Sequence, residues 1–342
     1  MSKIAVVTDT NSGITREEAK KLGVYLLPMP FIVDGTEYFE GVTCTYEHFF
    51  EMLEAGAEVS TSQPSPESLT AMWEEALATH DSVVHIPMSS ALSGSCDTAK
   101  ALAAEYNGRV CVVDNKRIAI TQRESVLDAL TLAEKGLTAA EICVQLENTA
   151  YNASIYLAVN TLELLKKSGR VTPAGAALAT LLGLKPVLQI QGGKLDAYAK
   201  VRGMANAEKT MLKALEKDLQ TRFAGKKVHI AAAYSGDIKP ALEWRKTIRK
   251  YFDDNSIELY KLPISICCHV SSGVKALGCF EYFECFLRLH TKPSLCSFEA
   301  QRGFSYLCSS ISMLAARLWR LPSRPLRLKM RKSSCSRSVS GV

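Results

Sequence analysis

The sequence predicts an α/β protein: an N-terminal parallel-sheet domain of three layers, followed by a C-terminal α+β domain. Three observations support this class. Strand-like apolar runs alternate with helical patterns from the N-terminus to about residue 150. A hairpin mixed with helices and strands follows. The 342 residues are enough for two domains with substantial cores.

Four apolar runs of strand length are expected to build the N-terminal sheet. They are "KIAVVTD", "VYLLPMPFIV", "SVVHIPM" and "RVCVVDN", which begin at residues 3, 24, 82 and 109. Helices are expected between them, over residues 15–23, over residues 45–56, from Pro66 and from Ser95. A hairpin turn is expected at Asp34 and Gly35. Because strands and helices alternate along the chain, most strands should be parallel in a sheet that is covered on both faces.

The second domain is expected to begin near residue 150 and to end at Gly278. Its hairpin is "KPVLQIQGGKLDAYAKV", with the turn at Gly192 and Gly193. A helix near residues 204–223 follows it. Then come a strand at "KVHIAAAYSG", an amphipathic helix at "PALEWRKTIRKYF" and a strand at "SIELYKLPI". We therefore assign residues 1–150 and 151–278 to the two domains.

The composition changes after Gly278. Residues 279–342 hold eleven Lys or Arg against three Glu, a net charge of +8, so residues 1–278 carry −2 of the total of +6. Neither helical nor strand periodicity persists, and we expect a disordered basic tail rich in Ser, Arg and Cys. Such a tail is either an arm for nucleic acid or anionic lipid, or a segment never selected to fold, as after a late shift of the coding frame. We favour the second interpretation and expect no nucleic-acid partner.

Signals for membranes, secretion and metals are missing from the sequence. The longest uncharged apolar stretch, "AGAALATLLGL" from Ala174, is shorter than the roughly 20 residues of a spanning helix. The first residues lack the features of a signal peptide, so a cytoplasmic location is expected. The cysteines form no CxxC pair and several sit in apolar runs, which is typical of buried free thiols. We predict no metal site and no cofactor.

Two hydroxyl-rich loops are the strongest functional signals. In the first hydroxyl loop, "VSTSQPSP" (residues 59–66), Ser65 and Pro66 make a helix start, which leaves Thr61 and Ser62 without a capping role. The second hydroxyl loop, "IPMSSALSGS" (residues 86–95), follows a predicted strand, and there Ser93 or Ser95 could simply cap the next helix. Ligands of α/β sheets bind beyond the carboxyl ends of strands, so the two loops are predicted to share one anion.

The residue types in these loops favour a single carboxylate. Neither loop contains Lys or Arg, and the chain has no GxxxxGK[ST] or GxGxxG loop for a nucleotide. The G-x-S-x-G elbow of a serine hydrolase is also missing. His85 and His269 could complete a triad with Ser93 only if the fold brought them together. An enzyme for an anionic substrate, with Ser93 as nucleophile or with the loops holding a phosphate, stays the alternative.

Several motifs together resemble the DegV family, bacterial fatty-acid-binding proteins that serve a fatty acid kinase. In order, they are "TSQPSP", "IPMSSALSGS", "VVDNKRIA", "TLELLKKSGRVTPAGAALATLLGLKPVLQI" and "GGKLDAYAKVRG". The resemblance covers residues 3 to about 278. It implies a two-domain fold that encloses a long-chain fatty acid, without catalysis, and that presents the bound acid to the kinase catalytic subunit. The resemblance is also compatible with transient contact between the protein and a membrane surface.

The resemblance also implies roles for particular residues. Thr61 and Ser62 of the first hydroxyl loop, Ser93 and Gly94 of the second, and His269 of "CHVSSGVKALG" are expected to bind the carboxylate. Arg202, and with weaker support Arg170, are expected to face the kinase. This chain departs from the family in two ways: the segment after His269 has fewer glycines, and the chain continues past the point where the family ends. The last strand of the second domain is therefore expected to be altered or absent.

Overall fold

A parallel sheet forms the centre of the N-terminal half. The computed structural model describes residues 3–177 and 184–283; residues 284–342, most of the predicted tail, lie outside the described residues. The strand order is β2-β1-β6-β7 and all three pairings are parallel. The strands are β1 Ile4–Asp9, β2 Tyr25–Leu27, β6 Ser82–Ile86 and β7 Val110–Val112.

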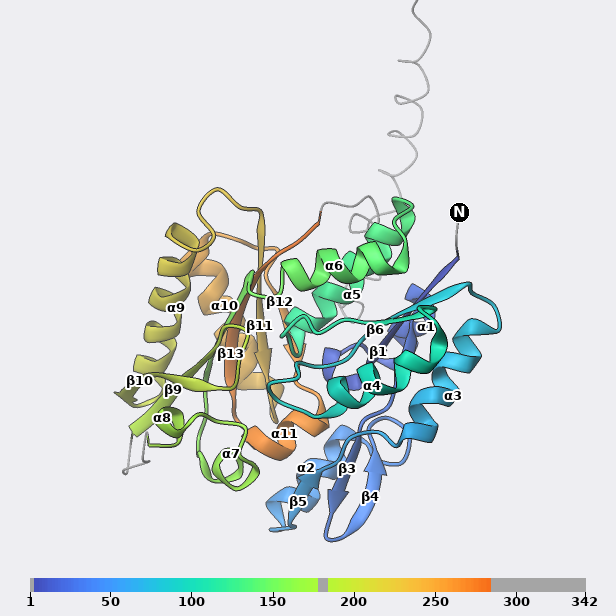
Figure 1. Cartoon of the computed structure of the whole chain (residues 1–342). Helices are drawn as coiled ribbons and strands as arrows, with labels where there is room; N and C mark the ends of the chain where they lie inside the picture. Colours follow the sequence, from blue (N-terminus) through green and yellow to red (C-terminus); the bar gives the residue numbers. More distant parts are fainter. Residues whose placement is uncertain (1–2, 178–183, 284–342) are drawn as a thin grey trace, which may run out of the picture. The chain divides into compact units, whose positions relative to one another are not determined.

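Helices cover both faces of this sheet (Figure 1). On one face, α3 (Pro66–Leu77) and α4 (Ser95–Ala103) pack around the fully buried Trp73. On the other face lie α1 (Arg16–Leu22), α5 (Ile120–Glu134) and α6 (Ala139–Asn148). Short 3-10 turns follow β1 at Thr10–Ser12 and α4 at Ala104–Tyr106. The predicted three-layer α/β class is confirmed.

A small antiparallel sheet interrupts this pattern. It has the order β4-β3-β5, with β3 Pro30–Val33, β4 Thr36–Phe39 and β5 Val59–Thr61, and α2 (Tyr46–Glu54) lies between β4 and β5 in the chain. The hairpin turn expected at residues 34–35 joins β3 to β4, with both residues in the left-handed region. The prediction of one strand over residues 24–33 is wrong. Pro28 and Pro30 lack the N–H of a ladder residue, and the chain changes sheets there.

The C-terminal half is a six-stranded mixed sheet in the order β10-β9-β8-β13-β11-β12. Only the β11–β12 pairing is parallel. The strands are β8 Ala153–Ala158, β9 Leu184–Ile190, β10 Asp196–Arg202, β11 Val228–Tyr234, β12 Glu258–Lys261 and β13 Lys275–Glu281. The β9–β10 hairpin turns through Gly192 and Gly193, as predicted.

Each face of this sheet is buried against different helices. The long amphipathic helices α9 (Met204–Gln220) and α10 (Ile238–Phe252) pack on one face, around Met211 and Trp244. The other face joins the largest apolar cluster among the described residues, which also includes β3, β5, α2 and the short helix α11 (Ile264–Val270). The short helices α7 (Glu163–Ser168) and α8 (Pro173–Ala176) precede β9. The shared cluster joins the sheets that lie before and after residue 150, and the division into two domains stays a prediction.

The last strand is present, contrary to the expectation that it is altered or absent. β13 lies in the middle of the sheet, paired with β8 on one side and with β11 on the other. Cys279, Phe280 and Glu281, which the composition assigned to the tail, complete this strand. Cys279 and Phe280 point to opposite faces of the sheet, and both are buried because each face is covered by a different apolar cluster. Within residues 3–177 and 184–283, no helix is both long and apolar enough to cross a membrane.

Trp73 should be a main determinant of stability. Its ring packs edge-on against His85 and Tyr106, with centroids 5.6 and 5.3 Å away. We expect Trp73→Ala to lower the free energy of unfolding by about 3–5 kcal/mol, the usual cost of truncating a buried aromatic side chain. Urea unfolding followed by circular dichroism measures this. Glu75→Ala, on the exposed face of the same helix, should change it by less than about 0.5 kcal/mol. Equal effects of the two changes would contradict this account of the core.

Candidate functional site

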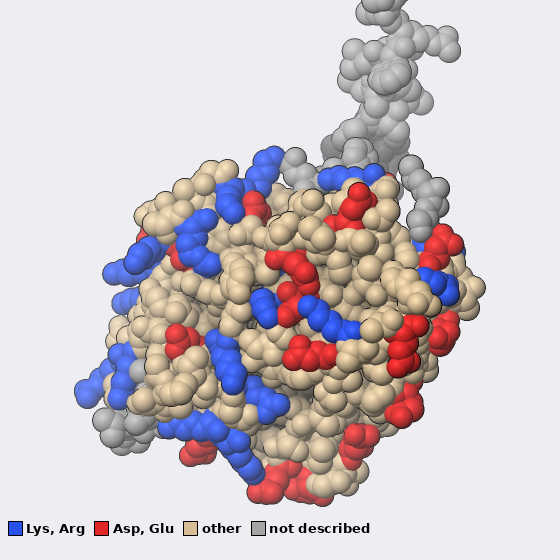
Figure 2. Space-filling model, in the orientation of Figure 1, with Lys and Arg blue, Asp and Glu red and all other residues tan. Residues whose placement is uncertain are grey.

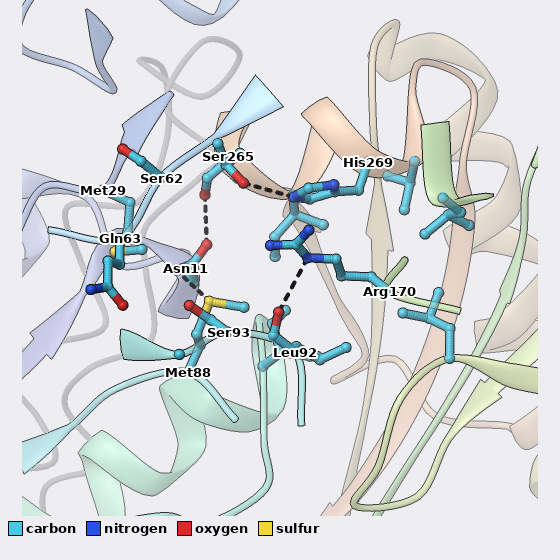
Figure 3. A pocket seen from close by; sticks show the side chains of 17 residues that line it. Asn11, Met29, Ser62, Gln63, Met88, Leu92, Ser93, Arg170, Ser265 and His269 are labelled. Carbon is cyan, nitrogen blue, oxygen red and sulfur yellow. Dashed lines mark hydrogen bonds between the residues drawn. The ribbon is translucent and has the colours of Figure 1, made fainter. Parts of the chain in front are cut away.

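The two hydroxyl loops meet at one pocket. Its volume is about 170 Å³, and its lining combines the end of β5, the loop after β6 and helix α11 (Figure 3). All five residues expected at the carboxylate contribute to the lining, namely Thr61, Ser62, Ser93, Gly94 and His269. Segments from both halves of the chain therefore converge on one cavity.

Thr61 and His269 form the central contact of the pocket. The Thr61 hydroxyl and Nε2 of His269 are hydrogen-bonded at 3.0 Å, across the two halves of the chain. Burial, together with the nearby charge of Arg170, lowers the pKa of His269 to about 4. Its ring is therefore neutral at pH 7, and Nδ1 is buried without a hydrogen-bond partner among the described residues. A neutral imidazole can donate or accept a hydrogen bond but does not supply a positive charge.

Ser93 and Gly94 lie where α4 begins. The Ser93 hydroxyl accepts a hydrogen bond from the N–H of Ser95 at 3.2 Å, which leaves its own O–H free to turn toward the pocket. Gly94, the residue before the helix, makes no side-chain cap. A Cβ at Gly94 would lie only 3.3 Å from Oε1 of Gln63, so glycine here allows the two hydroxyl loops to pack closely.

The buried carboxylate of Asp9 holds the second hydroxyl loop against the sheet. It accepts the N–H of Met88 at 2.9 Å, the N–H of Asn11 at 3.0 Å and the amide of Gln122 at 3.1 Å. Burial raises the pKa of Asp9 even though these hydrogen bonds oppose the shift. The end of β1, the loop after β6 and helix α5 are tied together by this one group.

A second set of bonds fixes the middle of the same loop. Ser90 donates its hydroxyl to Asp114 at 2.6 Å, and Lys116 donates to both Ser90 and Asp114. Although burial opposes it, hydrogen bonds from Lys116 and Ser90 lower the pKa of Asp114. Asp114 and Lys116 belong to the "VVDNKRIA" motif, which here fixes Ser90 and with it the loop that carries Ser93.

Sequence reasoning missed two polar residues of the pocket, Asn11 and Ser265. The Ser265 hydroxyl donates to Oδ1 of Asn11 at 2.5 Å, and both residues line the cavity. Asn11 lies in "TDTNSG", directly after β1, so the strand-end argument applied to both hydroxyl loops would also have found it. Ser265 carried no such signal, because its segment has no strong helical pattern in the sequence.

Arg170 lines the pocket as well, although the resemblance assigned it to the partner-facing surface. Its Nε donates to the carbonyl of Leu92 at 3.4 Å, and its side chain is only partly exposed. Figure 3 shows its guanidinium and the ring of His269 reaching toward the side where Asn11 and Ser93 lie. Neither hydroxyl loop contains Lys or Arg, and Arg170, from a distant segment of the chain, supplies a positive charge that the loops lack.

The inner wall of the pocket is apolar. It is lined by Ile118, Leu165, Leu195 and Val270, all members of the largest apolar cluster. The site therefore has a polar end, with hydroxyls and a guanidinium, and an apolar end formed by side chains of the packed core.

Arg202 lies away from the pocket. It is the exposed last residue of the edge strand β10. Figure 2 shows Lys and Arg gathered on the side of the molecule that carries β10 and α9, while acidic residues are more frequent on the side that carries α3. Among the exposed basic residues of that side are Lys194, Lys200, Lys209 and Lys213. Such a surface suits an acidic protein or an anionic surface.

The geometry gives a serine-hydrolase triad little support. His269 bonds to Thr61, and Ser93 is bonded to the backbone of Ser95. His85 is fully buried beneath α3 and outside the pocket lining, and burial lowers its pKa to about 3. No histidine of the described residues is hydrogen-bonded to Ser93, so no base is in place to activate it.

His269 should make stability fall in acid. The pKa of its ring is about 4 in the folded chain and about 6.5 in an unfolded one, so the unfolded chain takes up the proton first. The stability that depends on the neutral ring of His269 should be lost as pH falls from about 6.5 toward 4. The drop in urea midpoint between pH 7 and pH 5 should be smaller in His269→Asn than in the unchanged chain. His48→Asn, at an exposed ring, is the control, and equal drops in all three proteins would contradict the prediction.

Comparison with known proteins identifies the family. A model described as "Uncharacterised protein, DegV family" matches residues 3–283. A DegV domain-containing protein of Deinococcus radiodurans is 32% identical over 252 residues, which cover 73% of this chain and 88% of that one. A solved structure described as fatty acid binding of a DegV family protein from Thermus thermophilus has a TM-score of 0.74 at 30% identity and covers 82% of this chain and 99% of its own. A fatty acid binding DegV family protein from Streptococcus agalactiae gives 0.74 at 25% identity, over 83% and 100%. With its fold and with these relatives, the chain belongs to the DegV family.

Proposed function

We propose that this chain is a carrier that binds a long-chain fatty acid in the pocket and presents its carboxylate to a fatty acid kinase. The observation that carries the proposal is the two-ended pocket, with hydroxyls and Arg170 at one end and an apolar wall at the other. The Thermus thermophilus relative, described as fatty acid binding, supports the choice of ligand. The protein itself would perform no chemistry, and a cytoplasmic location stays a prediction.

The polar end suits a carboxylate on energetic grounds. Removing this anion from water costs several kcal/mol unless donors replace the lost water. Each hydrogen bond to a charged group returns about 1.5–3 kcal/mol. The O–H groups of Thr61 and Ser93 would supply two of these bonds, with Ser62, the backbone at Gly94 and His269 beside them. The guanidinium of Arg170 adds a favourable charge that the hydroxyl loops lack.

The acyl chain would supply most of the affinity. About fifteen methylenes at roughly 0.8 kcal/mol each give on the order of 12 kcal/mol before the costs of association are deducted. An apolar cavity of about 150 Å³ binds a benzene molecule, and this pocket measures about 170 Å³, which is too small for a long acyl chain. The chain must therefore continue past Ile118, Leu165 and Val270, and side chains of the apolar cluster must move apart to admit it.

We expect the recombinant protein to copurify with a long-chain acid. In the double variant Thr61→Ala, Ser93→Ala, the retained acid should fall by at least about tenfold, since each lost bond to a charged group is worth about 1.5–3 kcal/mol. Native mass spectrometry of the intact protein, followed by identification of the released lipid, measures both quantities.

The matched control is Ser60→Ala, Ser68→Ala, which removes two exposed hydroxyls from the neighbouring β5 and α3. It should retain the acid like the unchanged chain. If the Thr61, Ser93 variant retained the acid equally well, these hydroxyls would not be the carboxylate site. If the purified protein contained no acid and hydrolysed an ester, and if Ser93→Ala abolished this activity, the carrier hypothesis would be wrong and the enzyme hypothesis would take its place.

Arg202 is proposed to contact the kinase. Arg202→Ala should retain the bound acid but lower the rate of acyl phosphate formation by about tenfold or more, since a hot-spot arginine at an interface contributes about 2 kcal/mol or more. The assay combines the loaded protein, ATP and a purified fatty acid kinase catalytic subunit. Arg16→Ala, an exposed arginine on α1, away from the strand β10, is the control. A normal rate with Arg202→Ala would remove Arg202 from the interface and leave lipid binding unaffected.

A further inference from the structure

Two cysteines form a pair at the edge of the parallel sheet, far along the chain from the pocket residues of α11. Cys111 is the middle residue of the edge strand β7, and Cys143 belongs to α6. Alternation along β7 sends Val110 and Val112 toward α3 and α4, and Cys111 toward the opposite face, where α6 packs. There both cysteines pack against the same apolar cluster, and each thiol shifts the pKa of the other, while the Cys111 thiol also donates to the carbonyl of Gly108 at 3.8 Å.

The pair is held by rigid elements but can be reached by solvent. On α6, the buried stripe consists of Ala139, Ile142 and Leu146. Cys143 follows Ile142 and lies at the margin of this stripe, and both thiol-bearing residues are only partly buried. A small molecule can therefore approach the thiols without unfolding the sheet. In contrast, the structure buries the other five cysteines of the described residues: Cys44, Cys96, Cys267, Cys268 and Cys279.

The electrostatic surroundings make the two sulfurs unequal. The neighbouring Cys143 thiol lowers the pKa of Cys111 to about 7, against an opposing effect of burial, and Cys111 raises the pKa of Cys143. The charged groups that face the pair are Glu147 of α6 and Lys100 of α4, and they neutralise each other in an ion pair at 3.4 Å. Cys111 is thus the nucleophilic thiolate and Cys143 the neutral thiol beside it, the arrangement of a reactive and a resolving cysteine.

We propose that Cys111 and Cys143 are a redox-active pair that a peroxide oxidises to an intramolecular disulfide. The Cys111 thiolate attacks one oxygen of hydrogen peroxide, an S–O bond forms, the O–O bond breaks, and hydroxide leaves to take up a proton. The sulfur of Cys143 then attacks the resulting sulfenic acid, the S–S bond forms, and the S–O oxygen leaves as water with the thiol proton. Two thiols and one peroxide become one disulfide and two waters.

A metal site is the less suitable use of these thiols. Among the residues that the structure describes, no group of three or more His, Cys, Asp or Glu side chains is arranged to hold a metal ion. The disulfide would instead fasten α6 to the edge of the sheet. Glu147 of α6 also accepts the N–H of Asp114 at 3.1 Å, and Asp114 holds Ser90 of the second hydroxyl loop. Helix α6, which carries Cys143, is therefore bonded through Glu147 to Asp114, and Asp114 is bonded to the loop that carries Ser93.

Peptide mapping of the full chain tests the proposal. The protein is treated with hydrogen peroxide, alkylated and cleaved with trypsin, which releases Cys111 in residues 110–116 and Cys143 in residues 136–166. We expect these two peptides to be recovered as one disulfide-linked species that dithiothreitol separates. If they remained unlinked, or if either was linked to other cysteines as often as to its partner, the pair would not be the redox site.

Single variants separate the two roles. In Cys143→Ser the serine hydroxyl can still donate to the Cys111 thiolate, so peroxide should leave a sulfenic acid on Cys111 that dimedone labels at least about tenfold more than Cys96, a buried thiol with a pKa of about 12. In Cys111→Ser, Cys143 should not be labelled above this background. Equal labelling of Cys111 and Cys96, with circular dichroism unchanged, would overturn the proposal independently of any result on lipid binding.

Discussion

The hydrogen bond between Thr61 and His269 joins the two halves of the chain at the pocket, and the site depends on the packing that maintains it. Thr61 is fixed by β5, but His269 lies on a helix of only seven residues, which is too short to be stable by itself. Three further contacts hold α11 and the loop before α10 against the N-terminal half. Glu40 accepts the N–H of Ile264 at 3.0 Å, Asn11 accepts the Ser265 hydroxyl, and Tyr46 accepts the N–H of Gly236 at 3.1 Å. The position of His269 therefore depends on all the contacts between α11 and the N-terminal half of the chain.

These contacts also explain why a site made of mostly neutral donors can be specific. Hydroxyls and a neutral imidazole bind an anion well only where water is excluded and their directions are fixed. Asp9 and Asp114 provide that fixation for the second hydroxyl loop, each through several bonds to backbone or side chain. Neither of these two carboxylates is among the side chains that line the pocket.

Much of the fold could be predicted from the sequence, because periodicity reports burial directly. The strands and helices of both halves follow apolar patterns, and Ser65 caps α3 as the motif indicated, accepting the N–H of Ser68 at 3.1 Å. The split of residues 24–33 between two sheets was missed because apolar content does not reveal which sheet a strand joins. Helix α11 was missed because "ISICCHV" is apolar on all sides and shows no amphipathic period.

The site was predictable where polar residues follow a strand and unpredictable where distant segments contribute. The hydroxyl loops stand out because they contain more hydroxyl side chains than a turn and a helix cap require. In contrast, Arg170 looks like any surface charge in the sequence, and only the tertiary fold brings its guanidinium beside His269. The cysteine pair is similar, since Cys111 and Cys143 lie in separate predicted elements of the chain, with no spacing that suggests a link.

The central position of β13 has a consequence for how the protein is made. During synthesis, β8 and β11 leave the ribosome well before the strand that pairs between them, and each has an unpaired edge until residue 281 has emerged. Unpaired edges of this kind attract other strands. The C-terminal sheet can therefore close only late in translation, and a nascent chain that stalls before this point would be an expected client of chaperones.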